Sequence, residues 1–308
     1  MIAIIFPGQG SQKLGMQSEL ARNFKEIKST YQEASRELGY DLWKLAQGEV
    51  KEKIDKTEIT QPLMLTAGVA AWRVWRNHTD RIPKYMAGHS LGEYTALVCS
   101  ESLQFKEALK LVQKRAQLMQ AAIPEDEGSM AAILGLDDDI LVRLCTDESN
   151  DELVAPVNFN SPGQIVIAGN KNAVQRVIDR SKSVGAKRAL LLDVSVPSHC
   201  LLMKPTSELL LRELQDISIN KPTISVVNNA KVEQYQTPDQ IKEGLQKQLY
   251  SPVRWSEIIN YFISKGVTEI IECGPGRVLT GLSKKINKNI LAISMDSSDI
   301  INQYIKAK

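Results

Sequence analysis

Short apolar runs alternate along the chain with longer stretches in which apolar residues recur every three or four positions. The short runs are typical of buried strands, and the longer stretches are typical of helices with one apolar face. Pro62 is expected in the first turn of a helix that begins near residue 60. The alternation predicts an α/β fold, with a mainly parallel sheet covered by helices on both faces. Strands are predicted at residues 1–6, 84–87, 223–228 and 269–273, and helices at residues 60–74, 93–99, 105–122, 201–214, 238–249 and 278–286.

A different order of elements is predicted in the middle of the chain. Strands are predicted at residues 130–136, 153–159, 164–168 and 188–194, and helices at residues 137–146 and 173–183. The resulting order βαββαβ is typical of the ferredoxin-like motif. We therefore predict a small ferredoxin-like subdomain at residues 128–195, inserted into a larger unit made of residues 1–127 and 196–308.

The composition narrows the class of protein. Hydrophobic residues make up 43% of the 308 positions, which supports a sizeable core and argues against disorder. The net charge is only +2, which argues against a nucleic-acid partner. The four cysteines form no CxxC pair, so neither a disulfide framework nor a metal site is expected. Because the sequence shows neither a basic leader nor an apolar run of about 20 residues, we expect a cytoplasmic protein without membrane contact.

The sharpest motif is Gly88-His89-Ser90-Leu91-Gly92, a G-x-S-x-G pentapeptide. It lies between a predicted strand and a predicted helix, which is the context of a nucleophile elbow. Such a turn exposes the serine oxygen at a helix N-terminus, where negative charge is stabilised. The pentapeptide also occurs in tight strand-to-helix turns with an inert serine, and this is the alternative interpretation.

A nucleophilic serine needs a base, and histidine is the usual one. Of the three histidines, His78 lies in a polar stretch that predicts a solvated loop, and His89 next to the serine is predicted to pack. His199 follows a strand and a proline turn, where site residues collect, and is the predicted base. Asp193, Asp296 or a backbone carbonyl could orient it, so a triad and a dyad both stay open.

Acyl transfer also needs hydrogen-bond donors for an oxyanion. The N–H of Leu91, directly after the serine, is the first expected donor. The loop Pro7-Gly8-Gln9-Gly10 can supply the second from Gln9. A phosphate-binding loop is the alternative, but the GxGxxG spacing and the Walker lysine are missing. Arg115 alone is one of many helix cations, and it matters only if the substrate carries a carboxylate.

Seven motifs occur in one order along essentially the whole chain. They are Phe6-Pro7-Gly8-Gln9-Gly10-Ser11-Gln12, Gly88-His89-Ser90-Leu91-Gly92-Glu93-Tyr94, Arg115-Ala116-Gln117-Leu118-Met119, Asn158-Phe159-Asn160-Ser161-Pro162-Gly163-Gln164, Val196-Pro197-Ser198-His199, Gln248-Leu249-Tyr250-Ser251-Pro252-Val253 and Gly274-Pro275-Gly276. In this combination the chain resembles the malonyl-CoA:acyl-carrier-protein transacylase family of bacterial fatty-acid synthesis.

The resemblance implies a fold and a site. The fold would be an α/β-hydrolase-like large subdomain with the ferredoxin-like one inserted. The implied site has Ser90 as nucleophile, His199 as base, the N–H groups of Gln9 and Leu91 as oxyanion donors, Arg115 as the group that binds the malonyl carboxylate, and the backbone carbonyl of Gln248 as the group that orients His199.

The resemblance also implies an activity and partners. A malonyl group would pass from malonyl-CoA to the phosphopantetheine thiol of acyl carrier protein through a malonyl-serine intermediate. No cofactor and no metal are implied, and a monomer is expected. A trans-acting acyltransferase of polyketide assembly shares every motif and differs only in its partner. A serine esterase or thioesterase shares the elbow but should carry an acidic third residue, and a non-catalytic docking module should have lost part of the site.

A carrier protein of this kind is usually acidic, so a basic contact surface is expected. Ordinary solvated helix faces are the alternative for both candidate clusters. These are Arg176, Arg180, Lys182, Lys187 and Arg188, and Lys284, Lys285 and Lys288.

Overall fold

A parallel sheet forms the centre of the larger unit in this computed structural model, which describes residues 1–48, 51–124, 126–194 and 196–306. Within these residues the sheet has five strands in the order β7-β2-β1-β8-β9, and all of their pairings are parallel. The prediction of an α/β fold with a mainly parallel sheet is therefore confirmed. The strands are β1 (Ile2–Phe6), β2 (Tyr85–Gly88), β7 (Ser225–Val226), β8 (Glu269–Glu272) and β9 (Leu291–Ser294).

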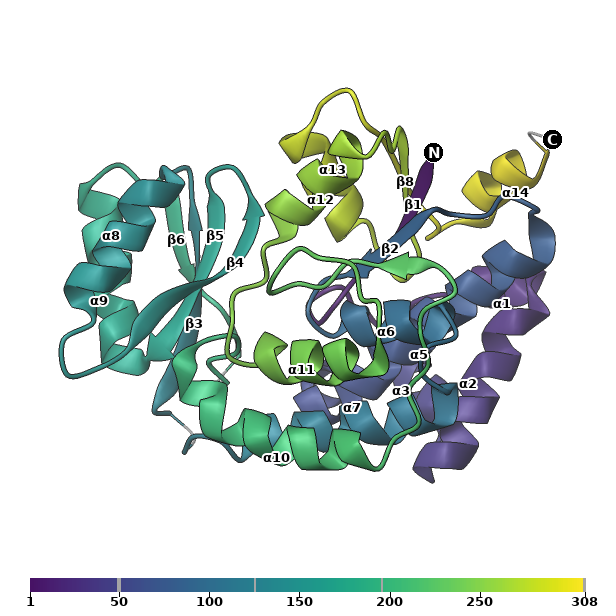
Figure 1. Cartoon of the computed structure of the whole chain (residues 1–308), viewed down its shortest axis with the longest axis horizontal. Helices are drawn as coiled ribbons and strands as arrows, with labels where there is room; N and C mark the ends of the chain where they lie inside the picture. The colour runs from purple at the N-terminus through teal and green to yellow at the C-terminus, as the bar shows by residue number, and fades with distance from the viewer. Residues whose placement is uncertain (49–50, 125, 195, 307–308) are drawn as a thin grey trace.

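Both faces of this sheet are buried, which explains the uninterrupted apolar strands. Successive side chains of a strand point to opposite faces. Ile4 and Phe6 of β1 pack with one core, whereas Ala3 and Ile5 pack with the other. Helices cover each face, as the arrangement around β1 and β2 in Figure 1 shows. The first core includes residues of α2 (Lys25–Leu38), α5 (Thr57–His78), α6 (Gly92–Cys99), α7 (Phe105–Gln120), α10 (Lys204–Gln215) and α11 (Pro238–Gln248), and the second includes residues of α12 (Trp255–Ser264) and α13 (Val278–Ile286).

Shorter elements complete the larger unit. They are α1 (Leu20–Asn23), α3 (Leu42–Gln47), α4 (Lys51–Asp55), the 3-10 turn η1 (Leu201–Met203) and α14 (Ser298–Lys306). Within the described residues, no helix combines the length and the apolar character that a bilayer crossing requires.

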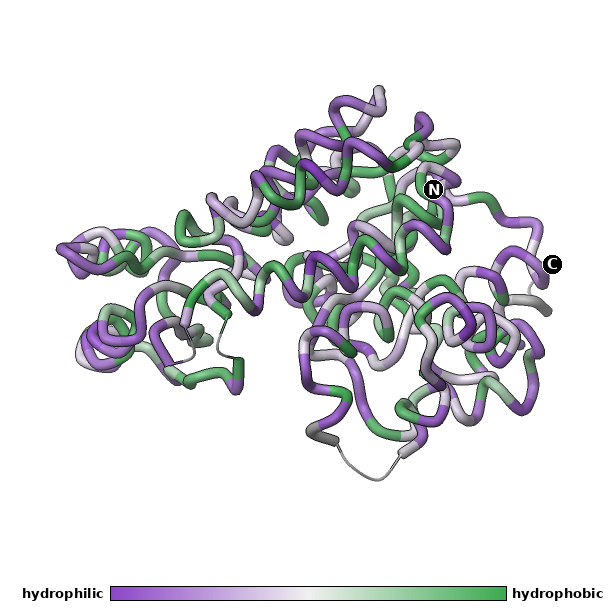
Figure 2. The backbone as a smooth tube through the Cα atoms, turned by 90° about the horizontal axis from the view of Figure 1, so that it is seen from below, coloured by the Kyte–Doolittle hydropathy of each residue, from purple (hydrophilic) through white to green (hydrophobic). Residues whose placement is uncertain are grey.

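The middle of the chain forms a second, antiparallel sheet. Its order β4-β5-β3-β6, with one helix after β3 and another after β5, is that of the predicted ferredoxin-like motif. Figures 1 and 2 show it as a lobe beside the larger unit. The elements are β3 (Gly128–Leu134), α8 (Asp138–Glu148), β4 (Val154–Ser161), β5 (Gln164–Asn170), α9 (Lys171–Ser183) and β6 (Arg188–Leu191). All of these elements fall within residues 128–195, the predicted bounds of the small subdomain. These bounds remain a prediction, and residue 195 lies outside the described residues.

Hydrogen bonds join the small sheet to the larger unit. The N–H of Phe159 on β4 donates to the carbonyl of Val253 at 3.0 Å, and the N–H of Val253 donates to the carbonyl of Val157 at 2.8 Å. The second face of the small sheet buries Val157 and Val166 in one cluster with Cys200. The segment around Cys200, which follows the small lobe in the sequence, therefore packs against the small sheet.

Three local predictions were wrong. Pro62 lies inside α5, because this helix begins at Thr57. Nearly all of the side chains from residue 60 to residue 75 are buried, and this packing outweighs the local preference of proline for a first turn. His78 ends the same helix and is not in a loop. The predicted strand at residues 223–228 shrinks to Ser225–Val226, while α12, β9 and α14 had not been predicted.

Candidate active site

The serine of the pentapeptide lies on a strained turn between β2 and α6. Ser90 has a φ of 51°, a left-handed conformation that is uncommon for a residue with a side chain. A Cβ added to Gly88 would lie 1.8 Å from the backbone carbon of Gly92, and one added to Gly92 would lie 2.1 Å from the carbonyl oxygen of Phe6. The turn is this tight because two of its residues have no side chain, and it has the shape of a nucleophile elbow.

Gly88→Ala is expected to lower the free energy of unfolding by about 3 kcal/mol or more, because its methyl group would collide with the backbone of the same turn. The matched control is Gly281→Ala in α13, where an added Cβ meets nothing within 4 Å. That control should be neutral or more stable by about 0.5–1 kcal/mol, because alanine favours helix interiors. Urea unfolding curves measure both changes. Equal stability of the two variants would contradict this account of the turn.

His199 faces the serine from the segment that returns from the small lobe. Its Nε2 lies 2.7 Å from Ser90 Oγ, and its Nδ1 lies 2.7 Å from the carbonyl oxygen of Gln248. A carbonyl only accepts, so Nδ1 carries the proton and Nε2 is free to accept one from the hydroxyl. The backbone of His199 is held as well, because its N–H donates to Leu249 at 2.9 Å. Burial, and after it the charge of Arg115, lowers the pKa of His199 to about 3.

Arg115 brings a buried positive charge to the same place. Its side chain, on α7, is only 1% exposed. Nη1 donates to Gln61 Oε1 at 2.7 Å, and Nη2 donates to Gln248 Oε1 at 3.2 Å and to Ser90 Oγ at 3.4 Å. Its guanidinium carbon lies 5.3 Å from the ring centre of Tyr94. Arg115 Nε is buried and has no hydrogen-bond partner within the described part of the chain, and Nη2 is the guanidinium nitrogen that faces Ser90 Oγ.

The loop after β1 lies against the elbow. A Cβ added to Gly8 would lie 2.5 Å from the carbonyl oxygen of His89 and 3.8 Å from the nitrogen of Leu91. Across the described ranges, neither the Leu91 N–H nor the Gln9 N–H has an acceptor in the protein. By contrast, the N–H of Ser90 donates to Asn229 Oδ1 at 2.7 Å and is occupied. Gln9 and Leu91 also line the same cavity, so both expected oxyanion donors are unused and belong to one site.

These groups open into one cavity of about 790 Å³. This volume lies within the range of small-molecule sites. Its lining includes Gln9, Ser90, Leu91, Arg115 and His199, with side chains from both lobes. The structure thus brings together every predicted site residue, with Gln248 directly behind His199.

Among the described residues, the other candidates form no hydrogen bond with the side chain of Ser90 or His199. His78 Nε2 lies 3.3 Å from Glu26 Oε1. Asp296 pairs with Lys13 at 3.1 Å. Asp193 does line the cavity, but the partner of His199 Nδ1 among the described residues is a backbone carbonyl. His89 packs against Trp255 at 5.5 Å between ring centres and contacts Asn160 Oδ1 at 2.8 Å.

Sequence reasoning missed the amide side chains that support the site. Gln61 binds Arg115, and Asn229 binds the backbone of Ser90. Gln61 directly precedes the largely apolar run at residues 62–72 of α5, which could have marked it as a buried polar residue. Asn229 follows β7 in the sequence and carried no comparable signal.

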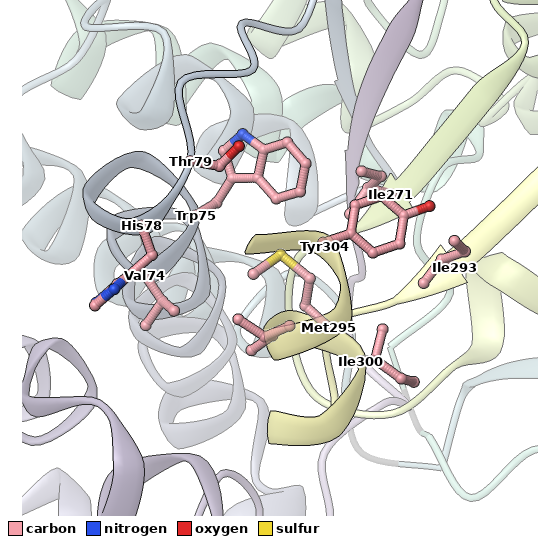
Figure 3. A pocket seen from close by; sticks show the side chains of 10 residues that line it. Val74, Trp75, His78, Thr79, Ile271, Ile293, Met295, Ile300 and Tyr304 are labelled. Atoms are coloured by element: carbon pink, nitrogen blue, oxygen red, sulfur yellow. The ribbon is translucent and has the colours of Figure 1, made fainter. Parts of the chain in front are cut away.

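A second hollow lies away from this cavity, under α14. Figure 3 shows apolar side chains of α5, β8, β9 and α14 around it, including Trp75, Ile271 and Tyr304. Its volume is about 10 Å³, room for one water molecule at most. We interpret it as a packing gap.

The first basic cluster is largely neutralised by neighbouring acids. Arg176 pairs with Glu148 at 3.0 Å and with Glu152 at 2.7 Å. Arg180 pairs with Glu148 at 2.8 Å, and Lys182 lies 3.5 Å from Asp179. In the second cluster Lys284, Lys285 and Lys288 are exposed.

Comparisons with known proteins agree with this geometry. The acyl transferase domain family matches residues 3–307. The malonyl CoA-acyl carrier protein transacylase of Escherichia coli O157:H7 is 49% identical over 294 residues, which cover 96% of this chain and 95% of that protein. The enzyme of the same name from Bacillus subtilis (strain 168) is 41% identical over 307 residues, covering 99% and 96%.

Solved structures are similar over the whole chain. An acyl carrier protein S-malonyltransferase from Vibrio cholerae O1 biovar eltor has a TM-score of 0.96 and 49% identity, covering 98% of this chain and 99% of that one. A malonyl-transacylase solved in complex with its type II PKS acyl-carrier protein has a TM-score of 0.98 and 48% identity, covering 100% and 99%.

Proposed function

The chain belongs to the acyl transferase domain family, and from this premise we propose that it transfers a malonyl group from malonyl-CoA to the phosphopantetheine thiol of an acyl carrier protein. The observation that supports the choice of a malonyl group is Arg115, a buried guanidinium that lines the cavity and whose Nη2 lies 3.4 Å from Ser90 Oγ. A planar guanidinium binds a carboxylate through two hydrogen bonds, and malonyl is an acyl group with a free carboxylate.

The first half-reaction loads the serine. Ser90 Oγ attacks the thioester carbonyl of malonyl-CoA while its proton passes to His199 Nε2. The Leu91 and Gln9 N–H groups donate to the oxyanion; a donor of this kind contributes about 10²–10³ in rate. The tetrahedral intermediate then releases the CoA thiolate, which takes the proton from His199 and leaves malonyl-Ser90. Gln248 holds the imidazole through its carbonyl, so a Ser-His dyad suffices.

The second half-reaction reverses these steps on another thiol. The phosphopantetheine thiol gives its proton to His199 and attacks the malonyl-Ser90 ester through the same oxyanion donors. The serine oxygen leaves and takes the proton back. The burial of His199 and Arg115 limits water at the reacting atoms and strengthens their electrostatic interactions.

Malonyl loading tests this proposal. The protein is incubated with malonyl-CoA, its intact mass is measured, and a peptide digest maps the adduct. We expect one malonyl group on Ser90, which is lost on addition of a phosphopantetheinylated carrier protein. Little turnover of p-nitrophenyl esters is expected. Ester hydrolysis without a stable adduct would favour a serine esterase and overturn the proposal.

Carriers of fatty-acid synthesis and of polyketide assembly are both candidate acceptors. The similarity to a transacylase solved with a type II PKS acyl-carrier protein supports the polyketide alternative. Relative kcat/KM values for the two carriers decide between them. A cytoplasmic location is part of the proposal, because the four cysteines are free thiols and such thiols are typical of reducing compartments.

The pH dependence of loading follows from the lowered pKa of His199. The base must be neutral to accept a proton, and with a pKa of about 3 it is neutral throughout the physiological range. Activity is therefore present above that pKa and lost only below it. We expect the rate of malonyl-Ser90 formation to change less than about twofold between about pH 5 and 8. Rapid-quench mass spectrometry measures this rate. A half-maximal rate near pH 6.5, the value of an unperturbed histidine, would contradict it.

A further inference from the structure

A carboxylate is buried directly beneath the elbow. Glu93, on α6, has no exposed surface. Its Oε1 accepts a hydrogen bond from the Tyr235 hydroxyl at 2.6 Å. Its Oε2 accepts two more, from the Asn229 N–H at 3.1 Å and from Gln248 Nε2 at 2.7 Å. A buried carboxylate is costly unless such donors compensate it, so its presence here calls for a reason.

Asn229 and Gln248, the two residues that donate to Glu93 Oε2, also hold Ser90 and His199. Asn229 Oδ1 accepts from the Ser90 N–H at 2.7 Å, and Asn229 Nδ2 donates to the carbonyl of Gly88 at 2.7 Å. Gln248 Nε2 donates to the carbonyl of Ser90 at 3.0 Å, while the backbone carbonyl of Gln248 contacts His199 Nδ1. One residue thus fixes the backbone of the nucleophile, and the other links that backbone to the base.

We propose that Glu93 is a positioning residue that sets the distance between Ser90 and His199, by anchoring Asn229 and Gln248 on one carboxylate oxygen. This inference deepens the proposed function and rests on it for the roles of Ser90 and His199. Glu93 does not reach the reacting atoms, so it acts through its two partners. Its own position is fixed by the short α6 helix and by the Tyr235 hydroxyl.

A second buried carboxylate shows what a purely structural role looks like. Glu272, at the end of β8, accepts from the N–H groups of Leu279 and Thr280 at 3.2 and 2.7 Å. These donors belong to the first turn of α13, whose N–H groups need acceptors. Burial raises the pKa of both Glu93 and Glu272 to about 7. Glu93 differs in that its partners hold the serine and the histidine, so Glu272 is a matched control.

Two conservative variants separate the position of Glu93 from its charge. Glu93→Gln has no charge but the same reach. Its amide oxygen can accept from Asn229 and Gln248, and its amide nitrogen can donate to Tyr235. Glu93→Asp keeps the charge but is one methylene shorter, so it cannot reach both amides with the helix in place. We expect Glu93→Gln to stay within about threefold of the wild type and Glu93→Asp to fall about 10²-fold, because an error of about 1 Å costs that much.

The readouts are two rate constants per folded molecule. One is malonyl-Ser90 formation from malonyl-CoA under single turnover, together with the KM for malonyl-CoA, which should not change in either variant. The other is the reaction of Ser90 with a small phosphonofluoridate, which has no carboxylate and needs no malonyl site. If the wild type reacts with the phosphonofluoridate but not with malonyl-CoA, the proposed function fails while the positioning role is still tested.

Each other outcome decides the proposal. If Ser90 reacts slowly in Glu93→Gln and at the wild-type rate in Glu93→Asp, the charge of Glu93 is what matters, and the positioning proposal is overturned. Both variants within threefold of the wild type would also overturn it. Glu272→Ala should lower the melting temperature and keep both rates. If it slows phosphonylation as much as Glu93→Asp does, the effect is general destabilisation and the proposal is wrong. If Glu93→Asp does not fold, the double variant Glu93→Gln, Tyr235→Phe takes its place. It removes the hydroxyl that would accept from the new amide nitrogen and hold residue 93. An unchanged rate of Ser90 phosphonylation in this variant would contradict the positioning role of Glu93.

Discussion

Ser90→Ala is expected to abolish covalent malonylation and to lower malonyl transfer by about 10⁴- to 10⁶-fold. The hydroxyl oxygen of Ser90 is the one protein atom that forms a bond with the acyl group in the proposed mechanism. Without this hydroxyl, the malonyl-serine intermediate that links the departure of CoA to the attack of the carrier thiol cannot form. Intact mass after incubation with malonyl-CoA and steady-state transfer to the carrier measure the two losses.

His199→Ala serves as a partner variant, and Ser207→Ala as a control. The Ser90→Ala, His199→Ala double variant should be no slower than the slower single variant, because the two side chains act as a unit. Ser207 is a buried serine on α10 outside the cavity lining, so its loss should leave transfer unchanged. Additive losses in the double variant, or malonylation of Ser90→Ala at a different serine, would refute the dyad.

Arg115→Ala should change which acyl group the protein transfers. Loss of a buried, charge-assisted hydrogen-bonding partner costs about 2–5 kcal/mol, which is roughly 30- to 5,000-fold in kcat/KM for malonyl-CoA. Acetyl-CoA has no carboxylate to pair with the guanidinium, so its transfer should change little or rise. Parallel kcat/KM measurements with the two donors give the ratio directly.

The control for this prediction is another paired arginine. Arg73→Ala removes a guanidinium that donates to Glu33 at 2.7 Å and does not line the cavity. It should leave the ratio of malonyl to acetyl transfer unchanged. Arg115→Lys should recover only part of the selectivity, since an ammonium group cannot bind a carboxylate in the planar two-bond geometry. Equal losses for malonyl and acetyl donors in Arg115→Ala would disprove the assignment.

Much of the fold could be predicted because the spacing of apolar residues along the sequence distinguishes buried strands from helices. Strands buried on both faces give short apolar runs, and the βαββαβ order of the small sheet appears directly in the alternation of periods. The predicted helix at residues 278–286 matches α13 in both bounds. Where packing outweighs local preference, the prediction fails, as at Pro62 inside α5.

The site was harder to predict from the sequence than the fold, because some of its groups are chemically common. Ser90 carries a motif, and His199 is one of only three histidines, so both could be selected by residue type. The group that faces His199 Nδ1 is a backbone carbonyl, which every residue has, and only the resemblance to a family indicated Gln248. Asn229 and Gln61 are ordinary amides in the sequence, and only folding places them against Ser90 and Arg115.

The order of these residues along the chain also bears on biosynthesis. Gln248 follows Ser90 by 158 positions, and β8, the neighbour of β1 in the sheet, is translated later still. At about 5–20 residues per second, a ribosome takes roughly 8–30 s to add that stretch. The base His199 and the Gln248 carbonyl that holds it are thus synthesised after Ser90, so the complete dyad can form only when most of the polypeptide has been made.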